Sequence, residues 1–189
     1  MTGMDTKTAL LDCAEDLVRT RGFDGFSYAD LAISVGIRKA SIHHHFPAKA
    51  DLGLALIERY SANFFARLDE ITANFATSGL QLKAYVAVCR AAIADGNRLC
   101  LSVALCSGRE SLSPAILNRI DQFHLVVTAW LASLFAQALI DGSLSSVGDC
   151  RDEAHACLAQ MEGAQLMARA AGDATRFDMA VAGLLGRVN

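Results

Sequence analysis

The 189-residue sequence contains only two prolines, and no two of its 14 glycines are adjacent. Because proline and glycine interrupt helices, their scarcity favours helices joined by short connections. No stretch alternates apolar and polar residues with a period of two, so we expect no β-sheet. The N-terminal segment lacks a basic start followed by an apolar block, and we therefore expect no signal peptide.

Long apolar runs and catalytic or metal-binding patterns are absent too. The longest nearly apolar run, residues 125–140, is short for a bilayer and contains Thr, Ser and Gln, so it predicts a buried core helix and no membrane partner. The six cysteines include no C-x-x-C pair and no Cys/His spacing typical of zinc. No nucleophile has a partnered base, and there is no phosphate loop or carboxylate cluster. We expect a cytoplasmic protein with reduced thiols, no enzymatic activity, no metal and no cofactor.

Apolar residues recur at helical spacing along most of the chain, and they predict an all-α fold of about nine helices. Ser27 with Asp30, and Thr175 with Asp178, are spaced as capping boxes that begin helices. Pro114 suits the first turn of a long helix. The expected helices are 6–21, a short one ending at Gly36, 38–45, a long one after Pro47, 80–94, a short one within 97–110, 114–141, 150–171 and 175–186.

Residues 31–50 contain three cations and no acid, although the whole chain has a net charge of −3. Within this segment, Ala32 is small enough for two helices to touch, and Gly36 can form the turn between them. Apolar residues stand at the positions that must face inward. This pattern predicts a helix-turn-helix, whose second helix enters the major groove of DNA. The inward positions are Leu31, Val35, Ile37 and Ile42.

The segment "FSYADLAISVGIRKASIHHHFPAKADLGLALIERY" resembles the N-terminal domain of the TetR/AcrR family of bacterial transcriptional repressors. The likeness rests on Ser27, the Asp30–Ala32 and Val35–Ile37 triplets, the end of the second helix at Phe46, and the Lys49–Leu52 motif. It departs from the family pattern at Ala40, where Gly is usual, and at His43, where Tyr is usual. The resemblance implies a helix-turn-helix DNA-binding domain over 1–50 and a ligand-binding and dimerisation domain over 51–189.

The expected DNA contacts differ in kind. Arg38 and Lys39 begin the recognition helix and reach bases or phosphates, which the sequence does not separate; a solvated basic surface is the alternative. Ser41 suits a base edge or a water. Backbone N–H groups at the start of the preceding helix are free to meet a phosphate, unless capping is their only role. The full set is Ser27, Tyr28, Arg38, Lys39, Ala40, Ser41, His43, His44 and Lys49.

The three consecutive histidines, His43–His45, do not suit a metal site. Consecutive helical residues point about 100° apart, so the three side chains cannot converge on one ion. The favoured interpretation is that two of the histidines face phosphate; the alternative is that one packs beneath Phe46 and the others are solvated. Lys49 resembles the family's phosphate-binding lysine, and an ordinary surface lysine is its alternative.

One recognition helix reads too few base pairs for genomic specificity, so double-stranded operator DNA is expected to bind a homodimer. The resemblance implies that the last two helices form the dimer interface, and burial within one subunit is the alternative. The middle helices are expected to enclose a pocket for a neutral, apolar or aromatic inducer, although each residue alone fits an ordinary core. Interface candidates are Cys157, Met161, Gly163, Ala164, Phe177, Val181 and Leu184; pocket candidates are Phe64, Leu68, Cys100, Phe123, His124, Trp130 and Gln165.

Taken together, these features predict a ligand-responsive transcriptional repressor that an inducer releases from a palindromic operator. An alternative uses Cys100 as a sensor of electrophiles or oxidants, because "RLCLSVALC" resembles such a segment in some family members. A buried, inert thiol is the competing interpretation of Cys100. A helical enzyme and a helix-turn-helix used only for protein contacts are the remaining alternatives.

Overall fold

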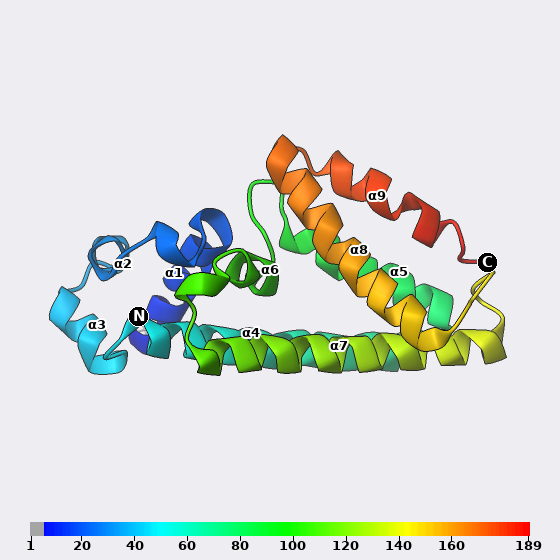
Figure 1. Ribbon diagram of the computed structural model, residues 1–189, viewed down its shortest axis with the longest axis horizontal. Helices are drawn as coiled ribbons and strands as arrows, with labels where there is room; N and C mark the ends of the chain where they lie inside the picture. Colours follow the sequence, from blue (N-terminus) through cyan, green and yellow to red (C-terminus); the bar gives the residue numbers. More distant parts are fainter. Residues whose placement is uncertain (1–5) are drawn as a thin grey trace. The chain divides into compact units, whose positions relative to one another are not determined.

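All regular secondary structure is helical in the computed structural model, which describes residues 6–189 (Figure 1). One isolated antiparallel bridge, between Leu144 and Val188, is the only strand-like pairing in that range. The all-α prediction with nine α-helices is therefore confirmed for the described residues. The elements are α1 (Thr6–Arg21), η1 (Phe23–Gly25), α2 (Tyr28–Val35), α3 (Lys39–His45), α4 (Lys49–Asn74), α5 (Ser78–Ala92), α6 (Leu101–Cys106), η2 (Arg109–Ser111), α7 (Pro114–Asp141), α8 (Cys150–Ala171) and α9 (Thr175–Leu185).

Local sequence explains where the short helices begin and end. The capping box at α2 is confirmed: the backbone N–H of Ser27 donates to Asp30 Oδ2 at 2.7 Å, and the N–H of Asp30 donates to Ser27 Oγ at 3.3 Å. Gly36 ends α2 with φ 74°, a left-handed conformation that favours glycine. The chain can therefore turn sharply into α3.

The capping box predicted from Thr175 and Asp178 is wrong. The N-cap of α9 is Ala174, which has no capping side chain. Asp173 instead accepts hydrogen bonds from the backbone N–H of Thr175 at 2.9 Å and from its hydroxyl at 2.7 Å. An aspartate bonding two residues ahead forms a local turn, and this turn occupies the threonine that the capping box required.

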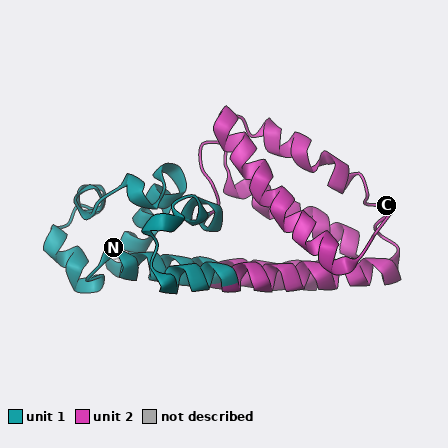
Figure 2. Cartoon of the chain, viewed as in Figure 1, with its two compact units in different colours: residues 1–61, 101–121 teal, residues 62–100, 122–189 magenta. Residues whose placement is uncertain are grey.

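The chain folds into two compact units (Figure 2). The first contains residues 1–61 and 101–121, and the second contains residues 62–100 and 122–189. The compact units therefore divide α4 after Ser61 and place α6 with the N-terminal helices. The boundary expected at residue 50 was placed between a DNA-binding and a ligand-binding domain. The division into compact units does not test it, so this boundary stays a prediction.

The first unit packs α2, α6 and the start of α4 around α1. Leu10, Leu31, Ile42 and Leu56 are fully buried in it. Gly53 allows close packing, because a Cβ there would lie 2.8 Å from Ile116 Cδ1. On the surface, charge-assisted hydrogen bonds join α4 to α1, since the guanidinium of Arg59 donates to Asp12 at 2.6 Å and to Glu15 at 2.9 Å.

The second unit contains α5, α8 and α9 with parts of α4 and α7. Its core includes Tyr85, Phe135 and Phe177, each buried. Along α4 the side chains of Leu68 and Ile71 are buried, whereas Phe75, one residue after the end of the helix, is 37% exposed.

The predicted long helix over 114–141 is confirmed as α7, but α7 is more exposed than the buried core helix expected from residues 125–140. It spans 28 residues and is the one helix in the described chain long and apolar enough, by length and composition alone, to cross a membrane. The central helix of a water-soluble domain passes the same test, and Val127, Leu131 and Phe135 are buried against the rest of the unit. The large exposed apolar side chains of α7 are Leu125, Val126, Leu139 and Ile140.

Candidate nucleic-acid interface

The relative placement of α2 and α3 follows from the turn at Gly36. The N–H groups of Gly36 and Ile37 both donate to the carbonyl of Ala32 at 3.0 Å, which closes the end of α2. Leu31 and Ile42 are fully buried on the inward faces of the two helices. These contacts hold α3 with its other face exposed, as a recognition helix requires.

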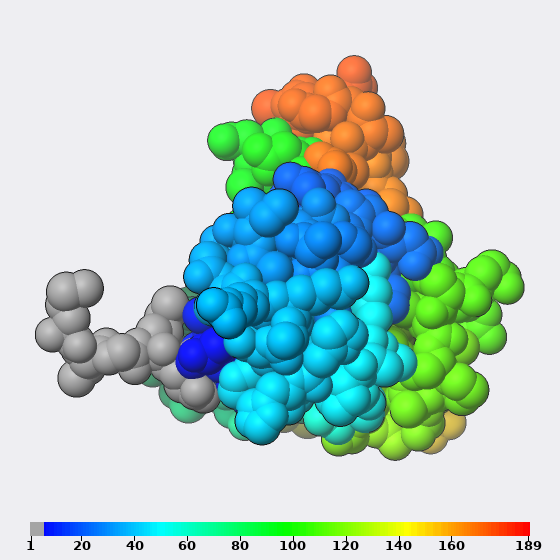
Figure 3. Space-filling view, turned by 90° about the vertical axis from the view of Figure 1, so that its left-hand side faces the viewer, coloured from blue at the N-terminus to red at the C-terminus, as the bar shows by residue number. Residues whose placement is uncertain are grey.

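The exposed face of α3 carries the expected contact residues and no carboxylate. Arg38, Lys39, Ala40, His43 and His44 are all exposed, whereas Ser41 is half-buried. Figure 3 shows the face of the first unit on which α1, α2 and α3 lie, in blue to cyan. A helix with this surface presents donors and positive charge to a polyanion.

His43 is positioned by a second contact. Its Nδ1 lies 3.1 Å from the carbonyl oxygen of Pro47, and its ring centroid lies 5.0 Å from that of Tyr28. Since a carbonyl only accepts, the proton belongs on Nδ1 and Nε2 stays available for another bond. The rings of His44 and His45 contact each other at 5.4 Å. No group of three or more His, Cys, Asp or Glu in residues 6–189 is arranged to hold a metal ion, and the absence of a metal stays a prediction.

Tyr28 has an internal role. Its hydroxyl lies 3.0 Å from the carbonyl of Phe46 and 2.8 Å from that of Ala48, and it donates to them. Burial, with a smaller effect from the charge of Asp51, raises the pKa of Tyr28 to about 12. The phenol therefore ties α2 to the connection between α3 and α4. Any contact of this residue with DNA is left to its backbone.

Lys49 is also engaged inside the unit. Its ammonium donates to the carbonyls of Phe23 at 2.6 Å and Phe26 at 2.5 Å, and it lies 4.3 Å from the centroid of the Phe26 ring. Burial lowers the pKa of Lys49, and the charges of nearby aspartates partly oppose this. Two of its three donors thus hold the start of α4 against the loop after α1. One donor is left for a phosphate.

One detail expected of this interface is wrong. The backbone N–H of Ser27 is not free to meet a phosphate, because it donates to Asp30 in the capping box. The capping interpretation accounts for Ser27, since the side chain of the same residue accepts from the N–H groups of Ala29 and Asp30. Its hydroxyl lies 2.7 Å from Asp30 Oδ2 and donates to it.

In the second unit, several of the predicted pocket residues meet in an aromatic cluster, in which Tyr85 and Phe123 are buried and Phe64, Phe65 and Trp130 are half-buried. Phe64 lies 5.2 Å from Phe123 and 6.4 Å from Tyr85, and Tyr85 lies 5.6 Å from Trp130, measured between ring centroids. The indole N–H of Trp130 donates to Thr72 Oγ1 at 3.0 Å. Tyr85, which sequence reasoning did not select, is 1% exposed and joins the other rings. Leu68 is also buried in this unit.

Polar groups from α7 and α8 accompany the cluster. Gln165 is buried and its Oε1 accepts from the backbone N–H of Cys100 at 2.8 Å. His124 Nε2 lies 3.0 Å from Glu162 Oε1, and each side chain is 28% exposed. Glu162, a carboxylate that sequence reasoning did not select, therefore lies beside the predicted pocket residue His124. Sequence spacing gave no direct signal for this pair, because the two residues lie on different helices.

Three of the four cysteines of this unit are not placed for reactivity. Cys89, Cys100 and Cys157 are buried. Burial raises the pKa of Cys157 to about 12 and that of Cys89 further, so these thiols stay protonated at neutral pH. Cys100 is 6% exposed. The geometry favours the inert interpretation of this residue over the sensing one.

The expected dimer residues lie mostly inside a single chain. All except Gly163 are between 0% and 6% exposed, because α8 packs against α9, and Gln160 Nε2 donates to the carbonyl of Ala180 at 2.8 Å. Burial within one subunit, the alternative stated above, accounts for these side chains. Gly163 differs, since a Cβ there would meet nothing within 4 Å. The buried residues are Cys157, Met161, Ala164, Phe177, Val181 and Leu184.

Comparison with known proteins decides the family. Residues 10–56 match the family described as bacterial regulatory proteins, tetR family. A TetR-family transcriptional regulator from Agrobacterium tumefaciens is 33% identical over 97% of both chains, and the two folds superpose with a TM-score of 0.91. The chain belongs to the TetR family.

Other TetR-family proteins are similar over different lengths. The repressor NemR of Escherichia coli K12 is 36% identical over 70 residues, and KstR2 of Rhodococcus jostii is 31% identical over 80 residues. These matches cover 35% and 39% of those proteins, so the sequence similarity spans little more than a third of these curated relatives. The crystal structure of reduced E. coli NemR covers 98% of both chains with 25% identity and a TM-score of 0.85.

A cation outside the quoted TetR motif lies beside the end of the recognition helix. Lys7, at the start of α1, is exposed, and its ammonium lies 5.9 Å from the centroid of the Phe46 ring at the end of α3. Sequence reasoning missed it because α1 is distant from α3 along the chain. The sequence offered only an unspecific signal, a cation in the first turn of the first helix.

The internal role of Tyr28 gives a stability prediction. Tyr28→Phe removes the hydroxyl that bonds Phe46 and Ala48, and we expect it to lower the free energy of unfolding by about 1–2 kcal/mol. Urea denaturation followed by circular dichroism measures the change. A free energy of unfolding equal to that of the wild type would show that the two hydrogen bonds do not hold α2 to the α3–α4 connection.

Proposed function

We propose that the protein is a ligand-responsive transcriptional repressor of the cytoplasm, which binds a palindromic operator as a homodimer and leaves it when a small inducer binds. The observation that carries the proposal is the exposed face of α3, which has cations, histidines and no carboxylate, on a helix fixed by a buried inner face. The names of the relatives NemR and KstR2 describe repressors, which supports the direction of control. No catalytic step, metal or cofactor is assigned.

Within this proposal the DNA-binding residues have separate tasks. Arg38 and Lys39 supply charge at the start of α3, and His43 donates through Nε2 when that nitrogen is protonated. Ala40 keeps the centre of the helix close to the bases, and Ser41 and His44 flank it. Tyr28 and Lys49 set the position of the recognition helix, and the remaining donor of Lys49 is directed to a phosphate.

The dimer is proposed to form through the exposed rather than the buried faces of α8 and α9. Leu166 and Met167 on α8 and Met179 on α9 are 46%, 57% and 67% exposed. Added Cβ atoms at Gly163 and Gly183 would both meet open space. Small residues between larger apolar ones let helices of two subunits approach closely. The α8 residues of this face are Ala156, Ala159, Gly163, Leu166, Met167 and Ala170.

The inducer is proposed to bind at the aromatic cluster. Aromatic walls favour an apolar or aromatic molecule, and Gln165 with the His124–Glu162 pair offers hydrogen bonds to one polar substituent. The buried thiols do not favour a covalent signal. Reversible binding is therefore the proposed mechanism, and release by oxidation of Cys100 is the alternative that its burial disfavours.

A gel-shift experiment with the DNA upstream of the protein's own gene tests the proposal. We expect a specific complex that competitor DNA of unrelated sequence does not displace at moderate salt. Metabolites that raise the melting temperature of the protein should also dissociate this complex. A protein that binds all DNA equally, or none, would contradict the repressor function.

A further inference from the structure

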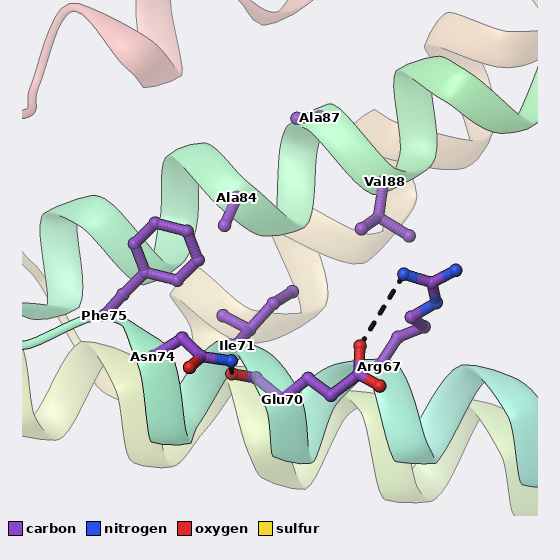
Figure 4. A pocket seen from close by; sticks show the side chains of 8 residues that line it. All are labelled: Arg67, Glu70, Ile71, Asn74, Phe75, Ala84, Ala87 and Val88. Carbon is purple, nitrogen blue, oxygen red and sulfur yellow. Dashed lines mark hydrogen bonds and ion pairs between the residues drawn. The ribbon is translucent and has the colours of Figure 1, made fainter.

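A surface groove in the second unit shares no residue with the aromatic cluster. It lies between α4 and α5 and has a volume of about 300 Å³ (Figure 4). That volume is at the small end of the range for ligand sites, which is roughly 300–1,000 Å³. We call it the α4–α5 groove; its lining residues are Arg67, Glu70, Ile71, Asn74, Phe75, Ala84, Ala87 and Val88.

The floor of the α4–α5 groove is apolar. Ile71 comes from α4 and Phe75 directly follows that helix, and the side chain of Phe75 is 37% exposed. The wall from α5 consists of Ala84, Ala87 and Val88, and these short side chains leave the space open (Figure 4). Leu80, one turn before Ala84 on the same face, is 44% exposed. An apolar chain laid in the groove would cover apolar surface that water now contacts.

The charges around the groove favour an anion. Arg67 Nη1 and Glu70 Oε2 are 3.6 Å apart, and their side chains are 66% and 61% exposed (Figure 4). An exposed pair of this kind contributes little free energy, so the guanidinium can turn to a ligand at small cost. Helix α5 contains no Asp or Glu, and its exposed Lys83 directly precedes Ala84. The groove itself is lined by one cation, Arg67, and one carboxylate, Glu70, and Lys83 adds positive charge on a neighbouring face of α5.

We propose that the α4–α5 groove binds a small amphipathic carboxylate. Its apolar chain lies on Ile71, Phe75 and Ala87, and its carboxylate accepts two parallel hydrogen bonds from Arg67. Lys83 adds attraction at longer range. The site is separate from the proposed inducer site, and it gives the protein a second class of ligand.

Isothermal titration calorimetry with octanoate tests the site, with octanol and octylamine as probes of the same chain length. We expect octanoate to bind about tenfold more tightly than octanol, because only the carboxylate engages the guanidinium. Arg67→Gln should reduce octanoate binding to the level of octanol. Ala87→Trp, at an exposed position, should abolish binding of both. Arg151→Gln replaces an exposed arginine of α8 and serves as the matched control, with no effect.

Three outcomes would overturn the proposal: no binding of octanoate, binding that neither Arg67→Gln nor Ala87→Trp changes, or tighter binding of octylamine through Glu70. Circular dichroism and melting temperature establish that each variant is folded. The titration contains no DNA, so a negative result does not contradict the proposed repressor function. A failed gel shift, in turn, does not contradict carboxylate binding in the α4–α5 groove.

Discussion

Gly163→Arg should convert the protein from a dimer to a monomer and weaken operator binding by roughly a hundredfold or more. Gly163 is half-buried on α8, and an added Cβ there would meet nothing within 4 Å. We therefore expect the variant subunit to keep its fold. A charged side chain in the proposed dimer interface, on the exposed faces of α8 and α9, prevents close approach of a second copy. Losing the dimer removes the gain of binding two half-sites together, which is roughly a hundred- to ten-thousandfold. Light scattering and gel shifts measure the two effects.

Two matched variants separate the contact from its side effects. Gly163→Ala keeps the residue small and should remain a dimer, with a gain in helix stability of up to about 1 kcal/mol. Ala73→Arg adds the same charge at an exposed position of α4 and should change neither mass nor operator affinity. Replacing a buried residue such as Leu184 would be less informative, because a charge at a 6% exposed position unfolds the subunit itself. A dimeric Gly163→Arg variant with full operator affinity would place the interface elsewhere.

Local chemistry made the DNA-binding unit predictable from the sequence. Ser27, Asp30 and Gly36 act within a few residues of their own positions, so their spacing alone determines where α2 begins and ends. The structure confirms these assignments. The tasks of Tyr28 and Lys49 were less accessible, because the phenol and the ammonium bond to carbonyls 18 to 26 residues away. Sequence spacing contains no direct record of such contacts.

The regulatory half was harder to predict because α8 has apolar or small residues on more than one face. A helical repeat identifies a face, but it does not say whether that face meets the same chain or a second copy. Cys157, Met161 and Ala164 therefore looked like interface residues, although they pack within the chain. Glu162 was overlooked for a related reason. From sequence alone, a carboxylate beside a predominantly apolar face is predicted to be solvated. Only the structure shows that Glu162 lies next to His124 on α7.

Replacing Arg38 and Lys39 together by alanine should weaken operator binding on the order of a hundredfold at moderate salt and reduce its salt dependence. Both side chains are exposed, so we expect a change in folding free energy within about 0.5 kcal/mol. Each cation that neutralises a phosphate contributes about 0.9 to the slope of log K against log salt. The slope should therefore fall by about 1.8 per subunit if both contact phosphates, and by about 0.9 if one of them reads a base. Gel shifts at several salt concentrations measure it.

Single variants then assign the two tasks. If Arg38 reads a guanine through two hydrogen bonds, Arg38→Ala should lose discrimination at one operator position, by about 1–3 kcal/mol, and leave the slope nearly unchanged. Lys39→Ala should weaken binding to all sequences equally and lower the slope. Arg151→Ala, which removes an exposed cation from α8, is the control and should do neither. Operator affinity and slope that survive the double replacement would exclude the start of α3 from the interface, because no other exposed arginine or lysine lies on that helix.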